Sequence, residues 1–332
     1  MRYLVTGGAG FIGSNLVDYL LGKYADAELV VLDSLTYAGI RENLQEAEAS
    51  GRVKFIKGDV CDEKAARRAC RGVDVVIHAA AESHVDRSIL SGQMAAQTNF
   101  MGTFTMLEAA RLAGVGKFLH LSTDEVYGSK PRGKLSETSL LNPRNPYSAA
   151  KCGADRMAQA YHTTYGLPVV ISRPSNNYGP RQFPEKLVPL FIYHALHDQP
   201  LPVYGDGKQI RDWLHVEDHC EAIDLLISQG EPGEVYNVPG GSEKRNIETI
   251  HFILEQLDKP RTLIRYVEDR PGNDVRYPLN GEKIAALGWR RSVAWEDGMR
   301  QTVRWYVRND DWLEAAMKRG KDFHARWYAH RK

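Results

Sequence analysis

The sequence predicts an α/β protein in which a doubly wound parallel β-sheet is joined to a smaller C-terminal α/β lobe. Short, almost continuously apolar runs recur through the first half of the chain, and such runs are typical of parallel strands buried on both faces. Helical patterns separate the runs, and regular strand–helix alternation is typical of a doubly wound sheet. The expected strands are Tyr3–Val5, Leu29–Leu32, Val53–Ile56, Val75–Ile77, Phe118–Leu121 and Val169–Ser172.

Helical periodicity is clear before the fifth expected strand. Phe100, Phe104, Leu107 and Ala110 recur at spacings of four, three and three residues, which predicts one apolar face of a long helix. A shorter helix-like segment follows at His219–Ile227.

The sequence pattern changes after Arg173, where prolines become frequent and the alternation of expected strands and helices becomes irregular. Near the C-terminus, Met299, Val303 and Tyr306 mark one face of a further helix. This change predicts two lobes of different construction. We expect the sheet domain to comprise residues 1–174 and also about 208–232, and the smaller lobe to comprise residues 175–207 and 233–332.

Composition excludes several classes of protein. The chain of 332 residues has 43 Lys and Arg against 42 Asp and Glu, a net charge of +1, so bulk charge gives no support to binding of nucleic acid or an anionic membrane. No run approaches the roughly 20 apolar residues that a membrane helix needs. The cysteines, Cys61, Cys70, Cys152 and Cys220, are scattered, which favours a reduced, cytoplasmic protein without a metal site.

A glycine-rich segment at residues 7–13, GGAGFIG, follows the first expected strand and opens a helix. Its spaced glycines permit a tight turn, close approach of the backbone to a pyrophosphate, and packing of helix on strand. Asp33 ends the second strand, 20 positions after Gly13, where a carboxylate binds the adenosine ribose and repels a 2′-phosphate. The pattern predicts a Rossmann-type site for NAD rather than NADP. The alternative is a glycine-rich turn in an α/β protein that binds no cofactor.

Carboxylates also follow other strands. Asp59 ends the third strand, where it is either a ligand of an adenine amino group or a helix cap. The segment STDEVYG begins at Ser122, where the fifth strand ends. Its adjacent Asp124 and Glu125 are suited to act as acid and base if their environments separate their pKa values. The alternative is an ordinary helix N-terminus, where acidic residues are favoured.

Tyr147 and Lys151 lie four residues apart at the start of an expected helix, so both side chains share one face. A lysine ammonium near a phenol stabilises phenolate and lowers the tyrosine pKa, which makes a base for a hydroxyl proton. By itself such a pair usually lies on a solvated surface. Its place after a strand of a cofactor-binding domain favours the catalytic interpretation.

Eight segments of the chain carry a family resemblance: GGAGFIG, LDSLTYAG, AAESHVDRS, STDEVYG, YSAAK, SNNYGP, FPEKLVP and YGDGKQIRDWLHVEDH. In order and across nearly the whole chain they resemble dTDP-glucose 4,6-dehydratases, in the sugar-nucleotide branch of the extended short-chain dehydrogenase/reductases. The glycine segment and the Tyr-Lys pair are shared by the wider superfamily. AAESHVDRS, TDE and IRDW are much narrower signals.

The resemblance implies a reaction in which the cofactor ends as it began. Tyr147 takes the proton of the sugar 4-hydroxyl while hydride passes from carbon 4 to NAD, with Lys151 tuning Tyr147 and Thr123 bonded near that hydroxyl. Glu125 then removes the proton on carbon 5, protonated Asp124 donates to the departing 6-hydroxyl, and hydride returns to carbon 6. NAD is therefore expected to stay bound throughout.

The same resemblance implies the residues that contact each ligand. The expected cofactor contacts are Gly7, Gly10, Phe11, Ile12, Gly13, Asp33, Ser34, Leu35, Thr36, Asp59, Val60, Ala79, Ala80, Ala81, Ser83, Thr98, Tyr147, Lys151 and Asn177. The expected contacts to a nucleotide sugar are Ser83, Thr123, Asn176, Lys186, Leu187, Pro202, Tyr204, Arg211, Asn246, Arg270 and Asn273.

The chain departs from the family pattern at residue 273. The family segment RPGH is here RPGN, and Asn273 carries no imidazolium charge, so the preferred nucleotide is open between dTDP and another such as UDP. Other hypotheses are a UDP-hexose 4-epimerase, a UDP-glucuronate decarboxylase and a non-catalytic NAD-binding scaffold. Asp124 and Glu125 argue against all three, because none of them needs an acid and a base to expel a 6-hydroxyl.

The resemblance also implies a homodimer. Its interface is expected on helices near residues 94–113 and 147–165. The apolar residues of those helices are equally compatible with an ordinary core.

Overall fold

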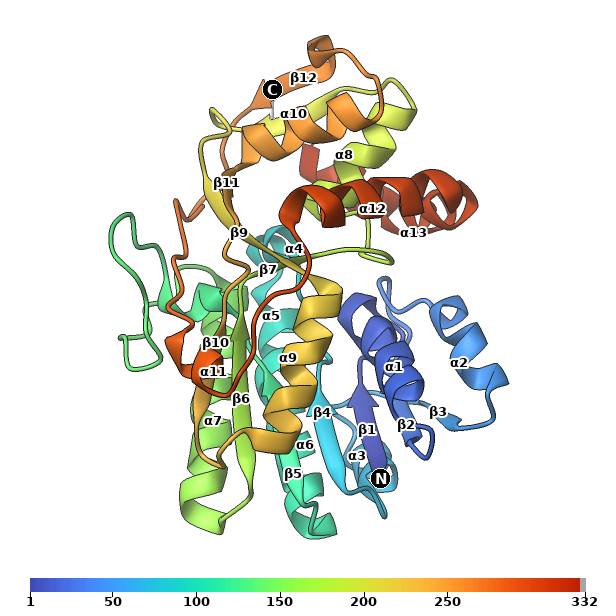
Figure 1. The fold of residues 1–332 in the computed structure, drawn as a ribbon, viewed down its shortest axis with the longest axis vertical. Coiled ribbons are helices and arrows are strands. Elements are labelled where there is room, and N and C mark those ends of the chain that lie inside the picture. Colours follow the sequence, from blue (N-terminus) through green and yellow to red (C-terminus); the bar gives the residue numbers. More distant parts are fainter. Residues whose placement is uncertain (329–332) are drawn as a thin grey trace.

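The computed structural model of the protein describes residues 1–328, apart from the side chains of residues 324, 325 and 328. Figure 1 shows a large sheet domain below and a smaller lobe above, at the end to which the strand arrows point. Residues 329–332, the end of the expected smaller lobe, lie outside the described residues.

The sheet domain is built on a parallel sheet, as predicted. Within the described residues its seven strands lie in the order β10-β6-β5-β4-β1-β2-β3, and every strand pair is parallel. In that order the strands are β10 (Val235–Val238), β6 (Val169–Pro174), β5 (Lys117–Leu121), β4 (Val75–His78), β1 (Arg2–Thr6), β2 (Glu28–Asp33) and β3 (Val53–Lys57). All six strands expected from the sequence are present.

Strand β10 lies in a different place from the one expected. Its residues fall within the segment 233–332 that the sequence assigns to the smaller lobe, yet Val235–Val238 pair with Ile171–Pro174 at the edge of the central sheet. A run of four residues between glycine-rich loops carries little periodicity of its own. The free edge of β6, which exists only in the folded sheet, decides where the run pairs.

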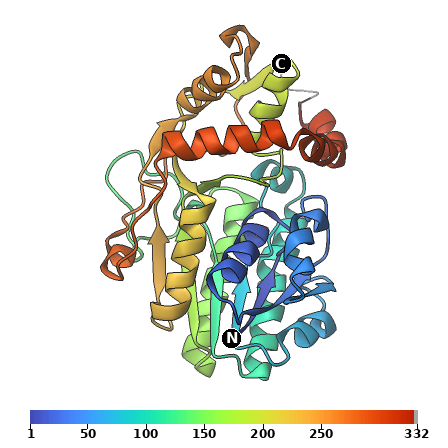
Figure 2. The same cartoon turned by 45° about the vertical axis from the view of Figure 1, so that its right-hand side comes forward.

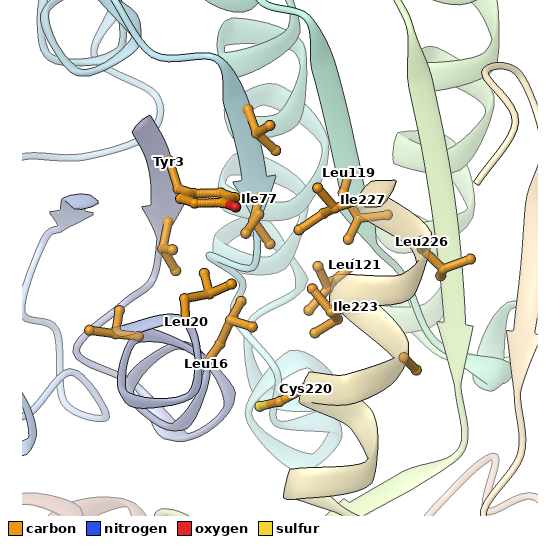
Figure 3. Packing of buried hydrophobic residues seen from close by; sticks show 14 of the residues in the cluster. Tyr3, Leu16, Leu20, Ile77, Leu119, Leu121, Cys220, Ile223, Leu226 and Ile227 are labelled. Carbon is orange, nitrogen blue, oxygen red and sulfur yellow. The ribbon is translucent and has the colours of Figure 1, made fainter. Parts of the chain in front are cut away.

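Helices cover both faces of the sheet because neighbouring strand residues point to opposite sides. On one face α1 (Phe11–Lys23) and α9 (Val216–Gln229) pack on residues such as Tyr3, Ile77 and Leu119 (Figure 3). The other face carries α3 (Glu63–Cys70), α6 (Gly102–Ala113) and α7 (Pro146–Tyr165). The shorter helices of this domain are α2 (Gln45–Ala49), α4 (Val85–Leu90), α5 (Gly92–Ala95) and α11 (Glu282–Ala286).

The long helix expected around Phe104 is broken by a π-turn at Ala96–Met101, between α5 and α6. Leu107 and Ala110 are fully buried, but Phe104 is 37% exposed. All three of these residues follow the π-turn and lie in α6. Steps of three residues on a helix of 3.6 residues per turn drift round its circumference, so Phe104 lies at the edge of the apolar face, where it packs against Tyr161 of α7.

The smaller lobe has its own apolar core, to which Met299, Val303 and Tyr306 contribute fully buried side chains, as their spacing predicts. Its helices are α8 (Leu187–Leu196), α10 (Asn246–Gln256), α12 (Trp295–Arg308) and α13 (Asp310–Tyr328). Its strands are β7 (Asn176–Tyr178), β8 (Leu201–Tyr204), β9 (Ile210–His215), β11 (Glu243–Arg245) and β12 (Ile264–Val267), in sheets ordered β11-β9-β7 and β12-β8.

Among the described residues, the helices are too short or too polar to cross a membrane.

A buried ion pair joins strand β6 to helix α7. Arg173 is 1% exposed, and its Nε donates to Asp155 Oδ2 at 2.8 Å. Replacing Arg173 by Met leaves the Asp155 carboxylate buried without its main partner, so we expect a loss of about 3–5 kcal/mol in the free energy of unfolding. Chemical denaturation measures this loss. The double variant Arg173→Met/Asp155→Leu should recover part of it; a double variant no more stable than Arg173→Met contradicts the interpretation.

Candidate active site

Two adjoining cavities lie where the sheet domain meets the smaller lobe, and both are lined by Gln182, Glu185 and Lys186. The first cavity runs along the glycine segment and the ends of β1, β2, β3 and β4. The second is lined chiefly by residues 176–213 and 246–273 of the smaller lobe. Carboxyl ends of parallel strands commonly border ligand sites in open α/β sheets.

The glycine segment fits a phosphate-binding turn. Gly7 has φ +68°, and a Cβ there would lie 2.8 Å from Ala80 Cα. A Cβ at Gly13 would overlap the Gly7 carbonyl oxygen. Helix α1 begins without a side-chain cap or an acidic residue in its first turn, so its N-terminal amides are suited to an anion.

Asp33 and Asp59 hold the turns at two strand ends. Asp33 accepts hydrogen bonds from the Ala9 and Leu35 amides at 2.9 and 2.8 Å, and burial raises its carboxyl pKa. Asp59 accepts a hydrogen bond from the Cys61 amide at 2.8 Å. The cap of α3 is Asp62 instead, so the helix-cap alternative for Asp59 is wrong.

The first cavity collects most of the predicted cofactor contacts. Four of the predicted residues lie elsewhere, namely Leu35, Tyr147, Lys151 and Asn177. Leu35 packs against the apolar core. Asn177 lines the second cavity, and its Oδ1 is 2.8 Å from His219 Nδ1. The predicted residues that line the first cavity are Gly7, Gly10, Phe11, Ile12, Gly13, Asp33, Ser34, Thr36, Asp59, Val60, Ala79, Ala80, Ala81, Ser83 and Thr98.

Asp124 sits in an environment that keeps its carboxyl group neutral. It is 1% exposed; Thr123 Oγ1 donates to its Oδ1 at 3.2 Å, and its Oδ2 is buried without a protein partner. Burial raises the pKa of Asp124 well above its usual range, and the neighbouring Glu125 charge raises it further, against the opposing hydrogen bond from Thr123. Asp124 lines neither cavity, but a protonated Oδ2 here has no protein group among the described residues to which it donates.

Glu125 has a different environment from its neighbour. Its side chain lines the second cavity, and Oε2 accepts a hydrogen bond from Asn145 Nδ2 at 3.2 Å. Asn145 also caps α7, whose first turn carries Tyr147. Adjacent carboxyl groups are thus separated into a buried one and one that faces the cavity.

Tyr147 and Lys151 share one face of α7, but their electrostatics differ from the expected pair. Burial raises the pKa of the Tyr147 phenol, the Glu125 charge raises it further, and a hydrogen bond with Thr123 opposes both. Lys151 Nζ donates to the Leu121 carbonyl at 2.5 Å, and burial lowers the lysine pKa to about 8. Lys151 is not among the main influences on the Tyr147 pKa, and its ammonium is directed to the Leu121 carbonyl at the end of β5.

The second cavity collects the predicted contacts to a nucleotide sugar, apart from Ser83 and Thr123. Asn273 Oδ1 accepts hydrogen bonds from Arg211 Nη2 at 3.1 Å and from Arg270 Nε at 3.3 Å. Lys186 Nζ donates to the Ser83 carbonyl at 2.5 Å. The predicted residues on the cavity wall are Asn176, Lys186, Leu187, Pro202, Tyr204, Arg211, Asn246, Arg270 and Asn273.

Sequence reasoning missed several polar residues of this cavity, among them His84, Asp86 and Glu185. Asp86 accepts hydrogen bonds from Arg270 Nη1 at 2.9 Å and from the Tyr204 hydroxyl at 2.7 Å. All three lie inside AAESHVDRS or FPEKLVP. Both segments carry the family resemblance, and AAESHVDRS is one of its narrow signals, so the charged residues of these segments were the signal that could have found them.

Within the described part of the chain, groups of three or more His, Cys, Asp or Glu side chains suited to a metal ion are absent.

The neutral state of Asp124 predicts a pH-dependent stability difference. Because its pKa is raised in the folded state, the unfolded chain loses this proton first, and stability from this group falls as pH rises above about 4. Asp124→Asn has no proton to lose, so its stability relative to the parent should increase between about pH 4 and about pH 8. Denaturation curves of both proteins at the two pH values measure this. A constant difference would show that Asp124 is ionised in the fold.

Comparisons with known proteins place this geometry in a family. A family model described as GDP-mannose 4,6 dehydratase matches residues 4–302. A dTDP-glucose 4,6-dehydratase of Actinoplanes sp. is 48% identical over 318 residues, covering 94% of this chain and 99% of the relative. The low-salt glycan biosynthesis protein Agl12 of Haloferax volcanii is 47% identical, covering 94% of this chain and 100% of the relative.

Solved structures of similar proteins have the same fold. A dTDP-glucose 4,6-dehydratase (DesIV) from Streptomyces venezuelae with NAD bound has a TM-score of 0.93 and 50% identity, covering 95% of this chain and 100% of that one. A UDP-glucuronic acid 4-epimerase from Bacillus cereus has a TM-score of 0.88 at 30% identity, covering 93% of this chain and 99% of that one. The fold is thus common to dehydratases and epimerases. On the family match and the full-length relatives together, the chain belongs to the GDP-mannose 4,6 dehydratase family of sugar-nucleotide enzymes and resembles its dTDP-glucose 4,6-dehydratases.

Proposed function

We propose that the protein is an NAD-dependent hydro-lyase that converts dTDP-glucose to dTDP-4-keto-6-deoxyglucose. The observation that carries this proposal is the adjacent pair at the end of β5: a buried, neutral Asp124 beside a Glu125 that faces the second cavity. Elimination of water across carbons 5 and 6 needs one acid and one base on neighbouring positions. Epimerisation at carbon 4 needs no such pair, and neither does loss of the carbon 6 carboxylate from carbon 5.

The first cavity fits NAD. Its glycine turn leaves no room for a Cβ at residues 7 and 13, the N-terminal amides of α1 are uncapped, and Asp33 stands at the end of β2. An acidic residue there favours NAD over NADP. When bound, NAD accepts hydride from carbon 4 and returns it to carbon 6. Relatives in the same family have been solved with NAD.

Oxidation at carbon 4 requires that the 4-hydroxyl lose its proton to Tyr147. Burial and nearby carboxyl groups oppose formation of the phenolate, while Thr123 favours it. Lys151, whose pKa burial lowers to about 8, supplies positive charge at the end of β5 one helical turn from Tyr147. The phenol therefore becomes an effective base only when further positive charge, such as a nicotinamide ring, enters the site.

Elimination then follows from the separated states of the two carboxyl groups. A ketone at carbon 4 acidifies the proton on carbon 5, which Glu125 removes. Asp124 gives the proton on Oδ2 to the departing 6-hydroxyl, so that water rather than hydroxide leaves. General acid and general base catalysis each typically accelerate such a step by about 10²–10⁴-fold.

The second cavity suits a nucleoside diphosphate. Lys186, Arg211 and Arg270 line it together, and guanidinium groups bind phosphate through paired hydrogen bonds. Asn273 holds both arginines at one point of the wall. Its neutral amide orients them without adding charge, so nucleotide choice rests with the base-facing residues Pro202, Tyr204 and Asn246.

The enzyme is further proposed to act as a homodimer in the cytoplasm. Its exposed apolar side chains include Met101, Phe104 and Leu112, on or just before α6, and Tyr165 at the end of α7. Phe104 packs edge-on against Tyr161 of α7, with ring centroids 6.3 Å apart. The two helices thus present a joint apolar surface. The four cysteines are free, as expected in a reducing compartment.

We propose a domain division that follows the two cores. The cofactor domain comprises residues 1–174 and about 208–232, extended to include β10. The substrate lobe comprises residues 175–207 and most of 239–332. Strand β9 (Ile210–His215) is the boundary between the two, because it pairs with β7 and β11 of the substrate lobe.

Mass spectrometry of the purified protein with dTDP-glucose, without added NAD, tests the function. We expect loss of one water from the sugar, and a slower reaction with UDP-glucose. Glu125→Gln should slow water loss by about 10²–10⁴-fold while a 4-keto sugar that keeps its water still forms; exposed Glu46→Gln should behave like the parent. An epimer or a decarboxylated sugar in place of dehydration would refute the proposal.

Asn273→Ala removes an acceptor that both Arg211 and Arg270 use. Because it orients groups that bind the diphosphate before and during the reaction, we expect KM to rise about tenfold, which corresponds to about 1.4 kcal/mol, with little change in kcat. Steady-state kinetics with dTDP-glucose measures both constants. A fall in kcat at constant KM would place Asn273 among the reacting groups instead.

Phe104→Glu places a charge in the apolar surface of α6. We expect the dimer to dissociate to a folded monomer, because burying an unpaired carboxylate costs more than the contact returns. Analytical ultracentrifugation measures the mass in solution. Leu140→Glu, at a side chain 90% exposed, is the control and should stay dimeric. A monomeric parent, or a dimeric Phe104→Glu variant, would contradict this interface.

A further inference from the structure

The C-terminal helix α13 (Asp310–Tyr328) lies against the loop at residues 34–44, which follows β2 and borders the first cavity. In Figures 1 and 2, α13 is drawn in dark red close above the blue N-terminal segments, at the junction of the two lobes. This loop follows Asp33, so it flanks the adenosine half of the proposed cofactor site.

In the first contact of α13 with this loop, Trp312 is linked to the glycine segment through Asn43. Trp312 Nε1 donates to Asn43 Oδ1 at 2.8 Å, and Asn43 Nδ2 donates to the Ala9 carbonyl at 3.1 Å. The Ile40 amide donates to the same carbonyl at 3.0 Å. Asn43 is 8% exposed. An indole on α13 thereby orients the amide that fixes the glycine segment to the loop.

The second contact holds the tightest part of the loop. Arg319 Nη2 donates to the Thr36 carbonyl at 2.7 Å and to the Gly39 carbonyl at 3.0 Å. Between β2 and these carbonyls Leu35 has φ +55°, an unfavourable conformation for a branched side chain. A Cβ at Gly39 would lie 2.7 Å from Asp33 Oδ1. The loop is thus strained and folded tightly onto Asp33, and α13 holds it from outside.

The helix also reaches the wall of the second cavity. The Phe323 ring packs edge-on against His84, with centroids 5.0 Å apart, and Arg87 lies over the Phe323 ring at 4.2 Å and over Tyr37 at 3.7 Å. Trp327 Nε1 donates to the Tyr204 hydroxyl at 2.5 Å. One helix therefore contacts the walls of both cavities.

We propose that α13 is a cofactor-retaining clasp, in which Trp312 and Arg319 are positioning residues that hold the 34–44 loop closed over the adenosine half of NAD. The inference rests on the NAD site of the proposed function, and is independent of the sugar chemistry. It supplies a physical reason for a cofactor that must stay bound through oxidation and reduction: release requires the loop to open, and opening requires these hydrogen bonds to break.

A simpler role for α13 is to complete an apolar core. Leu313 and Ala316 are fully buried and serve that role. The Trp312 ring also packs against two apolar cores, a contact that an aromatic replacement retains, while its N–H and the Arg319 guanidinium bond to the loop. The two roles are therefore separable: loss of packing lowers the stability of the apoprotein, whereas loss of the clasp accelerates release of NAD from the holoenzyme.

The experiment compares holoenzymes carrying Trp312→Phe, which keeps an aromatic ring but removes the N–H, or Arg319→Ala, with the parent. Exposed Lys318→Ala, on the same helix and of the same charge, is the matched control. After rapid dilution, the rate at which NAD leaves each protein is measured, together with the melting temperature of each apoprotein.

We expect NAD to leave each clasp variant about fivefold faster than the parent for each hydrogen bond lost, with Lys318→Ala and the apoprotein melting temperatures unchanged. Release at the parent rate from both variants would overturn the proposal, and so would faster release that is matched by a lower apoprotein melting temperature. The readout is binding of NAD alone. An absence of dehydration would therefore refute the proposed function and leave this result standing.

Discussion

Parallel pairing of the strands brings the carboxyl ends of β1, β2, β3, β4 and β5 to one edge of the central sheet, and the site depends on this convergence. The glycine segment, Asp33, Asp59 and Glu125 each follow or end a different strand, yet they border one pair of cavities. None of these segments needs an unusual backbone to reach the others. Because helices cover both faces of the sheet, polar groups lie at this edge, next to the buried core.

Burial at that edge of the sheet shifts the pKa values of the side chains there. Asp124 and Glu125 are neighbours in sequence, but one is enclosed and the other lines a cavity, so two carboxyl groups have different environments, and burial raises the pKa of Asp124. The same burial lowers the pKa of Lys151 and raises that of Tyr147. Positive charge placed beside the phenol would shift it towards its basic form.

The two lobes are joined by contacts that also arrange the ligand pocket. Asp86, from the sheet domain, binds Arg270 and Tyr204 of the smaller lobe. Asn273 links Arg270 to Arg211, and α13 contacts the walls of both cavities. The groups proposed to bind the nucleotide are therefore held by the same bonds that link the two lobes.

Residue type and spacing in the sequence determined many features of the fold and of the site. Six strands, the glycine turn, the Tyr147–Lys151 spacing and the acidic pair after β5 follow from periodicity, from the absence of a Cβ and from residue type. The segments AAESHVDRS and FPEKLVP identified the family, and the residues expected at each ligand largely line the two cavities.

Tertiary structure alone decided the rest, because it depends on neighbours distant in the chain. β10 joined the central sheet because β6 offered a free edge, and Phe104, at the edge of the apolar face of α6, packs on Tyr161 of α7 rather than in the core. Lys151 is directed to the Leu121 carbonyl, Asn273 lies between two arginines, and α13 contacts the loop after β2. Sequence spacing fixes which side chains share an element, but burial and partners that only the fold brings close decide what each one bonds.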